Sequence, residues 1–257
     1  MLNMKTFARL TRIKDYLLSN LTIIGLIFLI SPENLFSPKT IIVFLANLCL
    51  TAFIYAFNDV EDAEDDCHVL EKRKRNPIAN KDLTKTQGYI ISFSLLLTGL
   101  FLLSTISFLV FSLGLILALV GFLYSWKPVR FKSILFIDLI SHIICLGVLQ
   151  FFIAYLTFRT FDLFVIPFLM IIIPYSLTIQ ILFELKDFEV DKKTRIRNTI
   201  QKLGKFDIKK LLIFISVIAI IGFIILIFTV SSEHQMLIVL GLIIYMIELY
   251  KLFKRFG

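Results

Sequence analysis

The stretch Asn58–Asp66 reads NDVEDAEDD and follows directly on the apolar run Ile41–Phe57, IIVFLANLCLTAFIYAF. A second acidic stretch, ELKDFEVD at Glu184–Asp191, follows another long apolar run. Apolar runs of about 20 residues are typical of helices that cross the roughly 30 Å of hydrocarbon in a bilayer. The pattern therefore predicts membrane-spanning helices that end in clustered carboxylates. The apolar runs indicate the fold class, and the carboxylates indicate the function.

Apolar runs of similar length recur along all 257 residues, of which 58% are hydrophobic, and the mean hydropathy is +0.88. Within lipid, a single segment satisfies its backbone polar groups only as a helix. The sequence therefore predicts an all-α, polytopic transmembrane helical bundle of about eight helices. The expected spans are residues 16–31, 40–58, 88–106, 108–126, 134–158, 163–184, 209–230 and 235–253.

Lysine and arginine are distributed unevenly over the loops. All 27 of them except Lys39 and Arg159 fall at the termini or in loops that this arrangement of spans puts on one side. Because short loops rich in Lys and Arg stay in the cytoplasm, both termini are predicted to be cytoplasmic. The first span is expected to be retained, since no small-residue cleavage site follows it. The net charge of +8 is spread over short loops beside carboxylates, which disfavours a nucleic-acid partner.

Two sets of three carboxylates share one spacing, i, i+3 and i+7, which puts each set within about 60° on one face of a helix. The sets are Asp59, Asp62 and Asp66 in the first stretch, and Glu184, Asp187 and Asp191 in the second. Three like charges on one face repel one another unless cations neutralise them. Mg²⁺ prefers a few carboxylates completed by water and phosphate oxygens. The spacing therefore predicts a pair of magnesium sites and a ligand that carries phosphates.

NDVEDAEDD resembles the NDxxDxxxD signature of the UbiA superfamily of intramembrane prenyltransferases, and DFEVD at Asp187–Asp191 is similar to its second acidic motif. RNPI at Arg75–Ile78 and YSWKPVRFK at Tyr124–Lys132 resemble two further segments of the family. The likeness extends over about residues 10–210, with the motifs in the family's order. It implies a single transmembrane prenyltransferase domain over residues 1–257, with about eight helices, or nine as is usual in the family.

The resemblance also implies roles for individual residues. Two Mg²⁺ ions between the acidic motifs would hold an allylic diphosphate and stabilise the charge that develops as it leaves. The residues implied in catalysis are Asp62, Asp66, Asp187 and Asp191. The implied metal ligands are Asn58, Asp59, Asp62, Asp66, Glu184, Asp187 and Asp191. The residues implied in binding the diphosphate are Asn58, Arg75, Tyr124, Lys127, Arg130 and Lys132, with Arg suited to a bidentate grip.

The implied activity is a Mg²⁺-dependent transfer of a prenyl group from a polyprenyl diphosphate to a lipophilic acceptor. The acceptor would be a quinone precursor, a carotenoid or an ether lipid. The site would lie within membrane lipid and open to the cytoplasm. Two relatives of the superfamily are close alternatives. A polyprenyl-phosphate phosphoribosyltransferase has a similar first motif, and a terpene cyclase would use the same metal clamp. A cation transporter is an alternative of another class, but transport sites tend to lie near the midplane, whereas these carboxylates lie at predicted helix ends.

Other polar residues are less informative. The three cysteines, Cys49, Cys67 and Cys145, are too few and too scattered to predict a disulfide framework or a metal site. Asp138 and His142 lie one helical turn apart in the fifth span. Their spacing is compatible with a hydrogen-bonded structural pair and equally with a role in binding the acceptor.

Overall fold

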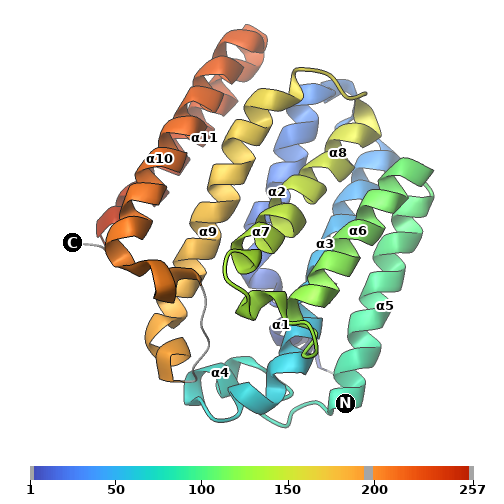
Figure 1. Ribbon diagram of the computed structural model, residues 1–257. Coiled ribbons are helices and arrows are strands. Elements are labelled where there is room, and N and C mark those ends of the chain that lie inside the picture. Colours follow the sequence, from blue (N-terminus) through green and yellow to red (C-terminus); the bar gives the residue numbers. More distant parts are fainter. Residues whose placement is uncertain (1–2, 194–198, 255–257) are drawn as a thin grey trace. The chain divides into compact units, whose positions relative to one another are not determined.

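The computed structural model of the chain describes residues 3–193 and 199–254. Within these ranges, the side chains of residues 18, 19, 186–193, 200, 201 and 203–206 lie outside the described set. The chain divides into two compact units, Met1–Phe131 with Leu149–Thr160 and Lys132–Val148 with Phe161–Gly257. The described parts of both units are helical (Figure 1).

The first unit is arranged around α3 (Pro38–Asp66), a helix of 29 residues. Four other long or medium helices contact α3, and the short α1 also contacts it. They are α2 (Ile13–Ile30), α5 (Lys85–Ser104), α6 (Phe108–Ser125) and α8 (Gln150–Phe158), and α1 comprises Met4–Thr11. A central position makes α3 the scaffold on which the rest of the unit is packed.

Local sequence sets the ends of these helices. Ser37 precedes Pro38 and accepts a hydrogen bond from the backbone N–H of Thr40 at 3.3 Å, which caps α3. Thr84 begins α5 with a capping box. Ser107 accepts a hydrogen bond from the N–H of Val110 at 3.2 Å and caps α6. This serine cap explains why the apolar stretch divides into α5 and α6 although no charged residue marks the boundary.

Aromatic residues fill the core of the first unit. Phe53 and Phe57 of α3 are fully buried. The ring of Phe57 stacks on Phe122 of α6, with centroids 4.8 Å apart, and lies 6.1 Å from the rings of Tyr89 and Phe93 of α5. Such ring pairs add to the free energy of burial and fix the rotation of each helix. They therefore determine which face of α3 each neighbour covers.

The second unit contains α7 (Ile137–Ile143), α9 (Val165–Lys193), α10 (Thr199–Thr229) and α11 (Ser232–Lys254). Helix α9 contacts α7 and α10, and α10 contacts α11. Its core consists of buried apolar residues from all four helices: Leu139, Leu177, Ile181, Ile208, Leu212, Ile215 and Leu252. The packing is thus that of a small helical bundle with an aliphatic interior.

Asp138 and His142 of α7 each have a partner on another element. The carboxylate of Asp138 accepts hydrogen bonds from the backbone N–H of Thr199 at 2.9 Å and from its hydroxyl at 2.6 Å. Thr199 is the first residue of α10, so Asp138 caps that helix. His142 Nδ1 lies 3.3 Å from the hydroxyl of Ser176 on α9. Both residues therefore join α7 to other helices of the second unit.

Eight helical segments of the described residues are long and apolar enough to cross a membrane. They are Ile13–Ile30, Pro38–Asp66, Lys85–Ser104, Phe108–Ser125, Ile137–Phe158, Val165–Leu185, Asp207–Thr229 and Ser232–Lys254, and the fifth includes a π-helical stretch, Ile144–Leu149. The predicted all-α bundle with eight spans is confirmed, and the chain is an integral multi-pass membrane protein. Three helices extend well beyond the expected bounds, since α3 continues to Asp66, α9 continues to Lys193 and α10 begins at Thr199.

Candidate functional site

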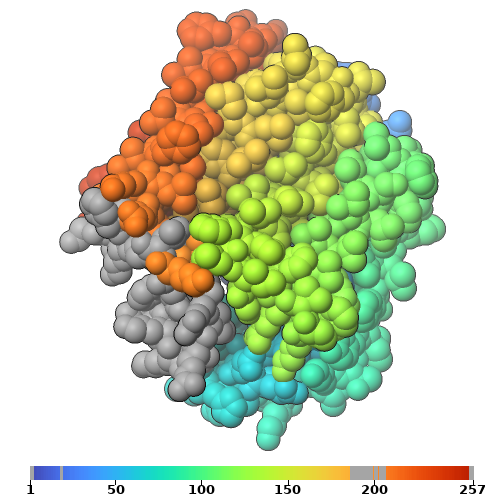
Figure 2. Space-filling model, in the orientation of Figure 1, coloured from blue at the N-terminus to red at the C-terminus, as the bar shows by residue number. Residues whose placement is uncertain are grey.

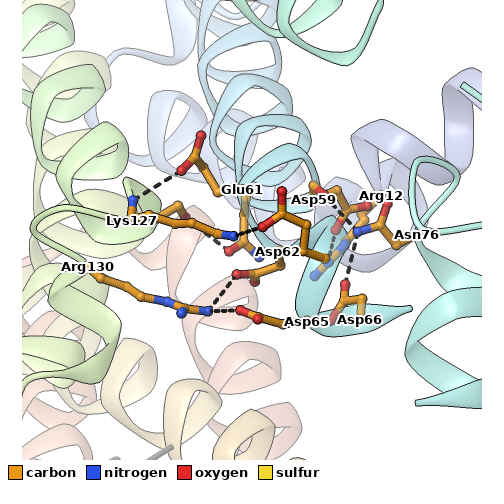
Figure 3. Close-up of polar contacts among 12 residues, drawn as sticks. Arg12, Asp59, Glu61, Asp62, Asp65, Asp66, Asn76, Lys127 and Arg130 are labelled. Carbon is orange, nitrogen blue, oxygen red and sulfur yellow. Dashed lines mark hydrogen bonds and ion pairs between the residues drawn. The ribbon is translucent and has the colours of Figure 1, made fainter. Parts of the chain in front are cut away.

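The acidic stretch forms the last turns of α3. Ala and Glu, which favour helices, carry the helix on to Asp66, and most of its carboxylates meet a partner from another segment of the first unit (Figure 3). These partners come from the turn between α1 and α2, from the loop after α4 (Leu70–Arg75), from α5, and from the loop after α6. Residues around α4 form the surface at the lower end of this unit (Figure 2).

Asp59 is paired with Arg12, which lies between α1 and α2. The guanidinium donates to Oδ1 of Asp59, and the aspartate is fully buried. Burial alone would lower the pKa of Arg12, but the charge of Asp59 and its hydrogen bond outweigh burial, so the pKa of Arg12 is raised. Arg12 therefore keeps its charge beside Asp59.

Asn76 connects two carboxyl-bearing residues of α3. Its side-chain amide donates to the backbone carbonyl of Asp59 at 2.7 Å and to Oδ2 of Asp66 at 3.0 Å. Its amide oxygen accepts hydrogen bonds from the N–H groups of Ile78 and Ala79. Asn76 is fully buried, so it fixes the loop after α4 against the carboxylates.

Arg130 lies between two other carboxylates. Its Nη2 is 3.0 Å from Asp62 and 2.7 Å from Asp65 (Figure 3). Partial burial would lower the pKa of Arg130, but its hydrogen bond to Asp65 and the charge of Asp62 raise it overall. The backbone of Arg130 adopts φ 48°, in the left-handed region. A single guanidinium thus neutralises two acids from across the first unit.

Glu61 and Glu64 hold the same loop from the other side. Glu61 is buried and accepts hydrogen bonds from the hydroxyl of Tyr89 at 2.6 Å and from the backbone N–H of Lys127 at 3.1 Å. The ammonium of Lys127 pairs with Glu64, and this hydrogen bond raises the pKa of Lys127. Both glutamates therefore act on the loop after α6.

A model of the UbiA prenyltransferase family matches residues 20–257 of the chain. The chain belongs to the UbiA prenyltransferase family. The family assignment predicted from the acidic motifs is thereby confirmed.

Solved structures of UbiA proteins share the fold of this family member. A UbiA homolog from Archaeoglobus fulgidus bound to GPP and Mg²⁺ is 21% identical, with a TM-score of 0.81 over 97% of this chain and 88% of that one. The same homolog bound to DMAPP and Mg²⁺ gives a TM-score of 0.80 at 21% identity over the same shares of both chains. A digeranylgeranylglyceryl phosphate synthase is 22% identical, with a TM-score of 0.69 over 98% of this chain and 88% of that one. No protein of curated function matches.

The structure brings together most of the predicted residues of the first motif in this UbiA protein. Asp59, Asp62 and Asp66 project from the end of α3, but each turns to a different partner, and no three acidic, histidine or cysteine side chains among the described residues converge as a metal shell. Asn58 accepts a hydrogen bond from the hydroxyl of Ser125 at 3.0 Å. The acids are thus gathered at one end of the unit, where cations from other segments balance them.

The remaining predicted residues occupy separate positions. Arg75 is exposed at the end of α4, Tyr124 lies in the last turn of α6, and Lys132 lies in the short 3₁₀ helix Phe131–Ser133. Glu184 of α9 accepts a hydrogen bond from Gln180 at 2.9 Å. Asp187 and Asp191 belong to α9, but their side chains lie outside the described residues.

Sequence reasoning missed several residues that the structure assigns to this site. In the sequence, Arg12 is one of the basic residues that predict a cytoplasmic terminus, and Asn76 is part of RNPI, but neither has a local signal that assigns it to this site. Glu61, Asp65 and Tyr89 were likewise given no role, although two of them belong to the acidic stretch. Helical spacing was a usable signal for Glu61 alone, because it sets this residue on a different face from Asp59, Asp62 and Asp66.

Proposed function

We propose that this protein is a Mg²⁺-dependent prenyltransferase and that residues 1–257 act as one catalytic domain. One observation carries the proposal: the carboxylates at the end of α3 form ion pairs with Arg12, Lys127 and Arg130, which come from distant segments of the chain. An array of acids and bases at one end of a helical bundle suits a ligand that combines metal ions with phosphate groups. Family membership and the GPP, DMAPP and Mg²⁺ bound by a relative of the same fold support this reading.

The donor atoms of the first acidic motif are of the kind that suits a magnesium ion, although no three of the described acidic side chains converge on one point. All donors offered by Asn58, Asp59, Asp62 and Asp66 are oxygens, apart from the amide nitrogen of Asn58, and hard oxygen ligands are those that Mg²⁺ prefers. Oδ2 of Asp59 is buried without a hydrogen-bond partner, so it is an acceptor that a cation would satisfy. Arg130 already demonstrates that the space between Asp62 and Asp65 accommodates a cationic group. We assign a first magnesium site to Asn58, Asp59, Asp62 and Asp66. We assign a second magnesium site to Glu184, Asp187 and Asp191.

The protein's own side chains would then bind and orient the donor. When bound, Mg²⁺ stabilises the negative charge of the departing diphosphate. Arg130 contacts Asp62 and Asp65, and Lys127 contacts Glu64, at the same end of α3. Both would transfer part of these contacts to phosphate oxygens, since an arginine fork matches two such oxygens. Arg75, Tyr124 and Lys132 complete the proposed diphosphate contacts. Asp62, Asp66, Asp187 and Asp191 are the proposed catalytic carboxylates.

The acceptor is proposed to be a lipophilic molecule that enters from the membrane, such as a quinone precursor, a carotenoid or an ether lipid. The fold shared with a digeranylgeranylglyceryl phosphate synthase makes an ether lipid one of the acceptors to offer. We also propose that both termini and the opening of the site face the cytoplasm, because nearly all Lys and Arg fall on that side of the predicted spans.

The test is diphosphate release by the purified protein. Geranyl, farnesyl and geranylgeranyl diphosphate are offered with a membrane lipid extract, with and without Mg²⁺. We expect Mg²⁺-dependent release that falls at least about 100-fold in Asp62→Ala and in Asp191→Ala, because removing one charged group aimed at a developing charge costs about that much. Asp207→Ala is the matched control, since Asp207 is an exposed acid paired only loosely with Lys210 at 4.0 Å.

The products distinguish the alternatives. The mass of a prenylated lipid identifies the acceptor class. Release without a prenylated acceptor, together with a cyclised hydrocarbon, indicates a terpene cyclase. If the folded protein releases diphosphate from no allylic donor, the proposal is wrong, and phosphoribosyl diphosphate is the next donor to test.

A further inference from the structure

The N-terminal helix α1 is anchored to the acidic end of α3. Leu10 is fully buried in a cluster of apolar residues from α3 and from the loop before α5: Ala56, Val60, Ala63, Ile78 and Leu83. The preceding residue, Arg9, donates hydrogen bonds to the carboxylate of Asp82 at 2.7 Å and to the carbonyl of Lys74 at 2.7 Å. These contacts fix α1 on the first unit and give the next residues of the chain a defined position.

Arg12 occupies a special position at the end of α1. Its backbone has φ 50° and ψ 31°, in the left-handed region that residues with a side chain rarely adopt. From this turn the side chain reaches Asp59 on α3 and lies over the ring of Tyr55, 5.6 Å from the centroid. Tyr55 in turn stacks on Tyr16 of α2 at 5.3 Å. Strained backbone that is held by its surroundings is found most often at functional sites.

The contacts of Asp59 leave a single atom available. Arg12 occupies Oδ1, and the amide of Asn76 holds the backbone carbonyl of the same residue. Oδ2 is buried and has no hydrogen-bond partner among the described residues. A buried carboxylate oxygen without a partner is unfavourable in a folded protein. Asp59 therefore presents one defined oxygen to a cationic or hydrogen-bonding group.

We propose that Arg12 is a positioning residue, which holds one oxygen of Asp59 and thereby aims the other at the divalent cation of the reaction. The inference rests on the proposed function, because that function supplies the cation. Groups that hold a metal ligand in place from behind fix its orientation, and their loss typically lowers metal affinity by about 10 to 100-fold. Anchoring of α1 is carried by Arg9 and Leu10, so it does not by itself require Arg12.

The experiment measures cation affinity directly. The full chain in lipid nanodiscs is titrated with Mn²⁺, a paramagnetic substitute for Mg²⁺, and free Mn²⁺ is read by electron spin resonance. We expect Arg12→Gln to weaken binding by about tenfold or more. Arg73→Gln is the matched control, because it removes an exposed arginine of α4 that takes no part in anchoring α1, and its Mn²⁺ affinity should stay within about twofold of the unmodified protein.

A double variant separates positioning from a general structural effect. If Arg12 acts through Asp59, then Arg12→Gln adds no further loss of Mn²⁺ affinity in an Asp59→Asn background. The double variant also removes both buried charges together, so this comparison decides the matter even if Arg12→Gln alone fails to fold. The proposal is wrong if Arg12→Gln binds Mn²⁺ like the unmodified protein, or if it weakens binding equally in both backgrounds. Absence of Mn²⁺ binding and of diphosphate release by the unmodified protein would instead overturn the proposed function.

Discussion

Glu61 accepts a hydrogen bond from the backbone N–H of Lys127 at 3.1 Å, which joins the end of α3 to the loop after α6. The same carboxylate accepts a hydrogen bond from Tyr89 of α5 at 2.6 Å. Glu61 is only 5% exposed and lies on a different face of α3 from Asp59, Asp62 and Asp66. Glu61 therefore supports the loop that carries Lys127 and Arg130. Because this contact is made by the backbone N–H of residue 127, it does not depend on which side chain that residue has.

Replacement of Glu61 tests this support. Glu61→Ala leaves the N–H of Lys127 and the hydroxyl of Tyr89 without their charged acceptor, and we expect a loss of about 2–3 kcal/mol in the free energy of unfolding. Under the proposed function, KM for the diphosphate donor should rise more than kcat falls, because the loop carries Lys127 and Arg130. Tyr89→Phe removes one of the two contacts and should lower stability by about 1 kcal/mol with KM unchanged. Equal effects of both variants on KM would contradict the role of the Lys127 contact.

Docking of α1 should depend on pH through Asp82. Hydrogen bonds from Asn80 and Arg9 lower the pKa of Asp82 below its ordinary value of 3.8. A carboxylate with a lowered pKa in the folded state contributes stability above its ordinary pKa and loses it as the pH falls through the lowered value. Below about pH 3.8, the protection of the α1 amides from hydrogen exchange, measured relative to the unfolded chain at the same pH, should therefore fall. In Asp82→Asn the step at this pH should vanish, and its persistence would show that another group is responsible.

Close helix packing at Gly121 gives a prediction for stability. A Cβ at Gly121 would lie 2.6 Å from Cγ1 of Ile54 on α3, whereas a Cβ at Gly25 of α2 meets nothing within 4 Å. Gly121→Ala should therefore destabilise the protein by about 1–3 kcal/mol through overpacking. Gly25→Ala should be neutral or slightly stabilising, because Ala favours a helix more than Gly does. Thermal unfolding in detergent compares the two, and equal shifts would contradict the packing of α6 on α3.

The cap on α10 gives a prediction for the second unit. Thr199→Val removes the hydroxyl that donates to Asp138 at 2.6 Å and that accepts from the N–H of Phe136 at 2.8 Å. Since the hydroxyl is buried and one partner is charged, we expect a loss of about 2 kcal/mol. Thr98→Val is the control, because Thr98 is exposed and its hydroxyl donates only to the carbonyl of Ser94 in its own helix. Unfolding that responds equally to both replacements would argue against a specific cap.

Hydropathy predicted the eight spans because membrane helices are defined by length and apolarity, which are local properties of the sequence. The start of α10 at Thr199 could not be predicted in this way. It depends on Asp138, which is 61 positions away and belongs to another helix. The beginnings of α5 and α6 were predicted closely, since Thr84 and Ser107 cap these helices through neighbours three residues away.

Helical spacing likewise predicted that Asp59, Asp62 and Asp66 share the end of one helix, but it did not predict their partners. Arg12 pairs with Asp59 across 47 positions, and Arg130 pairs with Asp62 across 68. Neither arginine carries a local signal that distinguishes it from the basic residues expected on the cytoplasmic side. Long-range pairs of this kind follow from tertiary packing, and only the structure revealed them.

The length of α3 has a consequence for the lipid around the protein. With 29 residues, the helix is about 43 Å long, whereas the hydrocarbon layer is about 30 Å thick. Its surplus is the acidic end, where Asp59, Asp62 and Asp66 lie. In a thicker bilayer these acidic turns would lie closer to the acyl chains, where charged side chains are unfavourable. A change in the tilt of the helix or a local thinning of the bilayer would then have to relieve this cost. Acyl-chain length is thus a means of control over these carboxylates that requires no change in the protein itself.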